Sequence, residues 1–233
     1  METEDDLLNR VRRRLETNRN WLCMIVGDTG SGKSFTALKI GELLDPDFNA
    51  KNVAFSPLEL IQLIKISKPG DVVVMDEAGI QFGARNFMSR SNKILSGIFQ
   101  AFRFKQIILI WTLPDLSMID ITARRLLHTY IETIGVDYKH EQTVVKWFDV
   151  KIDRWTGEYK HVYPRIMTSE GPVVVRVVRF GKPSDDLIGA YEEKKAKAFN
   201  EMLDNYEKVL LGEEASEPLK KRKNKGKKLE EEP

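Results

Sequence analysis

Uninterrupted apolar runs recur in the first part of the chain, at residues 21–26, 72–75 and 107–111. Continuous runs of this length are typical of strands buried on both faces of a parallel sheet. Residues 53–56 and 129–134 are two further strand candidates. Segments with apolar residues at helical spacing separate these runs. The alternation predicts an α/β fold with a mostly parallel sheet flanked by helices, connected by right-handed crossovers.

Helix start and stop signals lie between the strand candidates. A helix is expected to begin near Lys33 and to end at Asp45, which Pro46 follows. Ser56 before Pro57 is typical of the start of another helix. Amphipathic spacing predicts further helices over residues 4–19, 91–103 and 121–127.

The pattern changes after about residue 136. Residues 144–152, a turn at 153–157 and a return over 158–164 predict an antiparallel hairpin, and 184–211 reads as a charged helix. The lysine-rich end is of low complexity and is expected to be disordered. The expected parts are an N-terminal helix (1–20), an α/β core (21–135), an antiparallel β appendage (136–181), a C-terminal helix (182–211) and a disordered tail (212–233).

Residues 27–34 read Gly-Asp-Thr-Gly-Ser-Gly-Lys-Ser and match the phosphate-binding P-loop pattern, between an apolar strand and a helix. Glycines let backbone N–H groups turn toward phosphate oxygens, and the helix N-terminus favours negative charge. Lys33 is expected to reach the β- and γ-phosphates of ATP, and Ser34 to ligate Mg²⁺. The expected nucleotide-binding residues are Gly27, Asp28, Thr29, Gly30, Ser31, Gly32, Lys33 and Ser34.

Two carboxylates, Asp76 and Glu77, follow the apolar run 72–75 directly. This arrangement is typical of a Walker B element. Asp76 is expected to hold the magnesium, directly or through water. Glu77 is expected to orient and deprotonate the attacking water, which indicates hydrolysis rather than transfer to a small acceptor. Alternatively, Glu77 only caps the next segment.

Thr112 ends the next strand candidate, and the carboxyl ends of parallel strands meet at one edge of a sheet. Thr112 is therefore expected to converge with Gly27 and Asp76 and to point at the γ-phosphate; the alternative is a simple strand cap. An arginine finger would stabilise charge on the transferred phosphoryl group. The candidates are Arg85, Arg90, Arg103, Arg124 and Arg125.

Composition narrows the class of protein. The formal net charge of +2 means that any binding to nucleic acid must come from local patches. A single cysteine, Cys23, excludes a disulfide framework and is expected to be a buried strand residue. The three histidines lack metal-ligand spacing, and no apolar run approaches the length of a membrane span. We expect a soluble cytoplasmic protein without a membrane span.

Over roughly residues 20–135 the chain resembles the FtsK/HerA superfamily of DNA-pumping ATPases, which includes viral genome-packaging ATPases. The resemblance is carried by four features: the P-loop, the strand ending Met75-Asp76-Glu77-Ala78, residues 103–115 and residues 121–131. In this family an arginine stands just before the strand that ends in the γ-phosphate sensor. Arg103 has a similar position in this chain, and it therefore ranks first among the candidates for the arginine finger. The family often has glutamine at the end of that strand, where this chain has Thr112.

The resemblance implies a RecA-like core in a homo-oligomeric ring, commonly a hexamer, that hydrolyses ATP and moves double-stranded DNA for a virus or mobile element. The basic run 220–228 could contact the DNA or only aid solubility. The alternative is a nucleotide-dependent assembly factor that acts on protein partners, with the aromatic hairpin 144–164 as a docking arm. A small-molecule kinase is a third hypothesis, which Glu77 disfavours.

Overall fold

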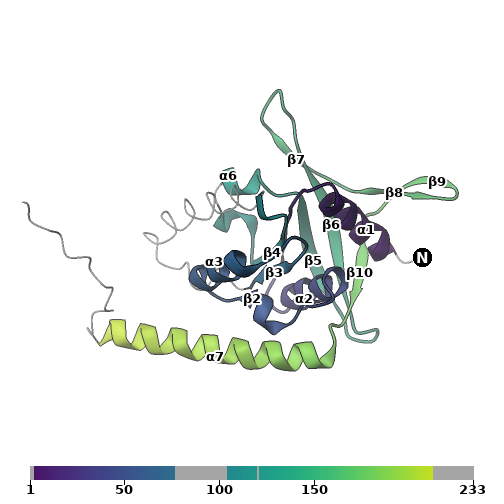
Figure 1. The fold of residues 1–233 in the computed structure, drawn as a ribbon. Coiled ribbons are helices and arrows are strands. Elements are labelled where there is room, and N and C mark those ends of the chain that lie inside the picture. The colour runs from purple at the N-terminus through teal and green to yellow at the C-terminus, as the bar shows by residue number, and fades with distance from the viewer. Residues whose placement is uncertain (1–2, 77–103, 120, 212–233) are drawn as a thin grey trace, which may run out of the picture. The chain divides into compact units, whose positions relative to one another are not determined.

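The computed structural model describes residues 3–76, 104–119 and 121–211 of the 233-residue chain (Figure 1). The chain divides into two units, Met1–Lys195 and Ala196–Pro233. Every site discussed below is built from residues of the first unit.

The main sheet of the first unit has the strand order β10-β6-β5-β1-β4-β3-β2, and β7 also pairs with β6. Its strands are β1 (Trp21–Val26), β2 (Val53–Ala54), β3 (Val72–Met75), β4 (Ile108–Leu113), β5 (Thr129–Asp137), β6 (Gln142–Ile152), β7 (Tyr159–Val162) and β10 (Val178–Gly181). The first five strands along the chain pair parallel with one another, whereas β6 pairs antiparallel with β5, β7 and β10. A separate hairpin is formed by β8 (Arg165–Thr168) and β9 (Gly171–Val174). The predicted mostly parallel α/β sheet is confirmed.

The described helices and helical turns are α1 (Thr3–Glu16), α2 (Lys33–Leu44), η1 (Ala50–Asn52), α3 (Pro57–Ile66), η2 (Leu116–Met118), α6 (Ile121–Arg124) and α7 (Asp185–Leu210). Ser56 caps α3, because its hydroxyl accepts a hydrogen bond of 3.2 Å from the backbone N–H of Glu59. Asp45 ends α2 and accepts a 3.0 Å hydrogen bond from the backbone N–H of Val72. This bond ties the end of α2 to the start of β3.

Both faces of the central strands are covered. Every residue of β1, β3 and β4 is buried, as continuous apolar runs require. One face packs with Leu60 of α3 and with Ala123 and Leu127 near α6, and α1 and α2 contact β1 as well as each other. Cys23 lies in this core, where burial raises the pKa of its thiol well above the ordinary value. Cys23 is thus a buried strand residue, as its place in the apolar run predicted.

Several predicted elements differ in extent from the structure. The helix predicted over residues 121–127 ends at Arg124, because the chain must turn before the backbone N–H of His128 donates to Leu22 O at 3.0 Å. The segment expected to form an antiparallel appendage supplies β6 and β10 to the main sheet. The helix predicted over residues 91–103 lies outside the described residues.

Candidate functional site

The P-loop connects the carboxyl end of β1 to the start of α2, at the edge where β3 and β4 also end. Gly30 and Gly32 have φ of 78° and 93°, in the left-handed region that favours glycine. Gly32 occupies the position before the first residue of α2. Backbone N–H groups at such a junction point toward a bound anion.

Position 27 requires glycine for two reasons: its φ is 148°, and Thr133 lies too close to leave room for a side chain. A Cβ atom there would lie 2.1 Å from Thr133 Oγ1 and 2.9 Å from the backbone oxygen of Thr133. Thr133 Oγ1 also lies 2.5 Å from Ser31 Oγ and donates to Val26 O at 3.0 Å. The side chain of Thr133 on β5 therefore supports the loop from behind.

We predict that Gly27→Ala lowers the free energy of unfolding by about 2–3 kcal/mol, because both φ and the contact with Thr133 are incompatible with a side chain. Gly30→Ala is the matched control, since no heavy atom lies within 4 Å of a Cβ there and only its φ is strained. Chemical denaturation of the two variants measures the difference. Equal losses of stability would contradict the role of Thr133.

Lys33 folds back over its own loop. Its Nζ donates hydrogen bonds to Gly27 O at 2.8 Å and to Asp28 O at 2.7 Å. Ser31 Oγ also donates to Asp28 O, at 2.6 Å. The loop is thus closed into a ring of hydrogen bonds, with the ammonium group next to the backbone that would surround phosphate.

Asp76 is the centre of a buried polar cluster at the end of β3. Its side chain is 1% exposed. Ser34 Oγ donates to its carboxylate at 3.0 and 3.1 Å, and Thr112 Oγ1 donates to Oδ1 at 2.6 Å. The structure therefore brings together Ser34, Asp76 and Thr112, which lie far apart in the sequence. Strand order explains part of this, because β4 lies between β1 and β3.

Two residues of α7 complete the cluster. Tyr191 OH donates to Asp76 Oδ2 at 2.6 Å, and Lys195 Nζ lies 3.9 Å from the same oxygen. Lys195 Nζ also donates to Tyr191 OH at 3.1 Å. This part of α7 is also held by Lys194, whose Nζ pairs with Glu59 Oε1 at 2.5 Å. Neither Tyr191 nor Lys195 was predicted as a site residue, since no local sequence motif marks either of them.

Tyr191→Phe is expected to lower the free energy of unfolding by about 1.5–3 kcal/mol, the range for a hydrogen bond to a charged group. The loss arises because Asp76 Oδ2 stays buried while it loses a donor. Tyr138→Phe removes a hydroxyl from a side chain that is 82% exposed, and it should change stability by less than about 0.5 kcal/mol. Urea denaturation compares the two proteins; equal stabilities would show that the Tyr191 bond is not stabilising.

A cavity of about 720 Å³ adjoins these groups. It is lined by the P-loop residues Thr29, Gly30, Gly32, Lys33 and Ser34, by Thr112 and by Tyr191 and Lys195. Its size is within the range of small-molecule sites. The hydroxyl of Ser34 and the carboxylate of Asp76 are hard oxygen donors of the kind that Mg²⁺ prefers. The residues present therefore fit a nucleotide with its magnesium ion.

Of the five candidate arginines, Arg124 and Arg125 lie within the described residues, and Arg125 is exposed. Arg124 Nε donates to Ile119 O at 2.9 Å, which is a local structural contact. Glu77 and the arginines Arg85, Arg90 and Arg103 lie outside the described residues. Within the described ranges, no group of three or more His, Cys, Asp or Glu side chains could hold a metal ion. In the same ranges, no helix has the length and apolar character needed to cross a membrane.

Comparison with known proteins finds no matching family model and no matching curated protein. The N-terminal domain of zonular occludens toxin from Neisseria meningitidis is 15% identical, with a TM-score of 0.36 over 61% of this chain and 93% of that chain. A KaiC-like protein from Pyrococcus horikoshii is 12% identical, with a TM-score of 0.36 over 67% and 90%. EssC (ATPases 2 and 3) from Geobacillus thermodenitrificans is 13% identical, with a TM-score of 0.35 over 82% and 45%. Likenesses this distant assign no activity; strand order and the P-loop geometry identify a P-loop NTPase fold.

Proposed function

We propose that the chain is a magnesium-dependent ATPase that couples hydrolysis to the translocation or packaging of double-stranded DNA. The observation that carries the ATPase part is the meeting of Ser34, Asp76 and Thr112 beside the P-loop. These three groups and Lys33 line or adjoin one cavity at the carboxyl edge of the sheet, where open α/β sheets bind ligands.

ATP would bind with its phosphates against the P-loop backbone and Lys33 Nζ. Binding would draw the ammonium group from Gly27 O and Asp28 O toward the β- and γ-phosphates. Ser34 and Asp76 would hold Mg²⁺, which would neutralise charge on the phosphates. Thr112, at the end of β4, would face the γ-phosphate.

Glu77 would act as the general base. It would accept a proton from the attacking water as the new oxygen–phosphorus bond forms, and the bond from the γ-phosphorus to the bridging oxygen breaks to release ADP. Arg103 would supply positive charge to the transferred phosphoryl group in a homo-oligomeric ring, as the FtsK/HerA resemblance implies.

Movement along DNA distinguishes a motor from a simple ATPase. A translocating protein should displace the third strand of a triplex from a DNA duplex, and only while ATP is hydrolysed. We expect strand displacement by the wild-type chain with ATP and none with a non-hydrolysable analogue. Hydrolysis without displacement on any duplex length would contradict translocation.

One observation favours a second function, nucleotide-dependent assembly of protein partners. Trp155, in the turn between β6 and β7, is 97% exposed. Two other aromatic residues of the hairpin pack inside the protein: Trp147 stacks on Trp21, and Phe148 packs against Tyr130. An exposed tryptophan at a hairpin turn is suited to a protein contact. Capture of capsid or membrane proteins that is independent of DNA, and lost in Trp155→Ala, would favour this function.

A further inference from the structure

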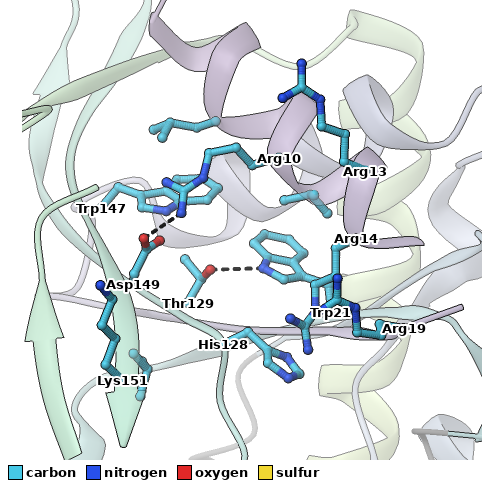
Figure 2. A pocket seen from close by; sticks show the side chains of 13 residues that line it. Arg10, Arg13, Arg14, Arg19, Trp21, His128, Thr129, Trp147, Asp149 and Lys151 are labelled. Carbon is cyan, nitrogen blue, oxygen red and sulfur yellow. Dashed lines mark hydrogen bonds and ion pairs between the residues drawn. The ribbon is translucent and has the colours of Figure 1, made fainter. Parts of the chain in front are cut away.

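A basic recess lies at the amino ends of β1 and β5, at the opposite edge of the sheet from the P-loop. Its volume is about 370 Å³. Because β1 is six residues long, about 20 Å separates the recess from the nucleotide cavity. Figure 2 shows the arginines on and just after α1, and the lysine on β6. These cations are Arg10, Arg13, Arg14, Arg19 and Lys151.

Positive charge dominates the recess. Asp149 is the one carboxylate among the described lining residues, and Arg10 Nη2 neutralises it at 2.6 Å. In the part of the chain that the structure describes, no carboxylate lies within 4 Å of Arg13, Arg19 or Lys151. All three side chains are exposed. The surplus of cations is suited to a ligand with several negative charges.

A pair of like charges extends this surface along the hairpin. Lys151 of β6 is directly opposite Lys160 of β7 in the antiparallel register. Side chains directly opposite each other share a face, and like charges in such positions destabilise a sheet. Lys151 also shares its face with Trp147 and Asp149, which line the basic recess. A bound polyanion would relieve the repulsion between the two lysines.

The floor of the recess decides which polyanion fits. Trp21 and Trp147 are stacked with ring centroids 5.8 Å apart, and each is 2% exposed. Trp21 Nε1 donates to Thr129 Oγ1 at 2.9 Å, which fixes its ring. Proteins that bind single strands stack unpaired bases on exposed aromatic faces, and these indoles are buried. A duplex needs no such surface, because it presents its phosphates outward.

We propose that the basic recess binds the phosphodiester backbone of double-stranded DNA without sequence preference. Guanidinium groups match phosphate oxygens in two-pronged hydrogen bonds, and the ammonium groups of Lys151 and Lys160 add point charges along the same backbone. The inference rests on the proposed DNA-coupled function and names the surface that holds the DNA. ATP binding and DNA binding then occupy opposite edges of one sheet.

The test compares the full-length wild-type chain with Arg13→Gln/Arg19→Gln/Lys151→Gln. The matched control, Lys51→Gln/Lys65→Gln/Lys68→Gln, removes three charges from exposed positions away from the recess. Fluorescence anisotropy measures binding to a mixed-sequence duplex over a range of salt concentrations. The recess variant should bind about tenfold or more weakly, and the slope of log affinity against log salt should shrink by about 3. In the control variant, the affinity for the duplex and the salt slope should both change much less.

ATP hydrolysis without DNA is measured on all three proteins. Weak duplex binding by the recess variant, with unchanged basal hydrolysis, would support the inference. If the recess variant binds the duplex as tightly as the wild type does, the basic recess is not the DNA-binding surface. The proposed DNA-coupled ATPase activity would be unaffected by that result. If the wild type does not bind the duplex at low salt, both DNA binding at the basic recess and the coupling of hydrolysis to DNA are contradicted. Tighter binding of a single strand than of the duplex would overturn the choice of ligand.

Discussion

The Lys33→Ala protein is expected to bind ATP at least about 30-fold more weakly than the wild type, and to show no measurable turnover. Removing one partner of a desolvated charge pair costs about 2–5 kcal/mol, and Lys33 Nζ lies 2.8 Å from Gly27 O and 2.7 Å from Asp28 O of the P-loop. The variant also loses the two hydrogen bonds that Lys33 Nζ donates to the P-loop backbone. Isothermal titration with an ATP analogue measures the affinity.

Lys39→Ala is the matched control for this substitution. Lys39 also lies on α2, but its Nζ pairs with Glu42 at 2.8 Å and it does not line the nucleotide cavity. Affinity for ATP should stay within about twofold, since a partly exposed ion pair on a helix contributes little. Wild-type affinity in Lys33→Ala would show that the P-loop does not bind the triphosphate.

The Glu77→Gln protein is expected to bind ATP normally and to hydrolyse it about 10²–10⁴-fold more slowly. This is the usual contribution of a general base. Glu77 directly follows Asp76, whose carboxylate is held by Ser34, Thr112 and Tyr191. Glutamine keeps the size of the side chain but cannot accept the proton of the attacking water. Single-turnover hydrolysis, with saturating enzyme, isolates the chemical step.

The matched control is Glu158→Gln. Glu158 is exposed and does not line the nucleotide cavity, so the substitution should leave the rate of ATP hydrolysis unchanged. If Glu77→Gln hydrolyses ATP at the wild-type rate, Glu77 is not the base, and the alternative that it caps the next segment would stand. Slow hydrolysis together with weak ATP binding would instead indicate a structural defect.

The central fold follows from local patterns in the sequence. The continuous apolar runs predicted β1, β3 and β4, and Ser56 with Pro57 predicted the start of α3. Because parallel strands share one carboxyl edge, the meeting of Asp76 and Thr112 could also be expected before the structure was known.

Contacts between distant segments could not be predicted in the same way. Tyr191 reaches Asp76 across 115 positions of sequence, through the packing of α7, and no periodicity encodes that contact. Thr133 supports Gly27 because β5 lies beside β1, which depends on strand order. The basic recess combines α1 with β6, and the arginines of α1 alone are typical of a solvated helix face.

The central claim is that ATP hydrolysis at the P-loop site is coupled to double-stranded DNA. The most direct measurement is steady-state phosphate release by the wild-type chain, with Mg²⁺, as the concentration of duplex DNA is raised. Turnover should rise to a plateau with the duplex, and neither the basal nor the stimulated rate should remain in Lys33→Ala. A turnover rate that the duplex leaves unchanged, at low salt and at every concentration, would contradict the account.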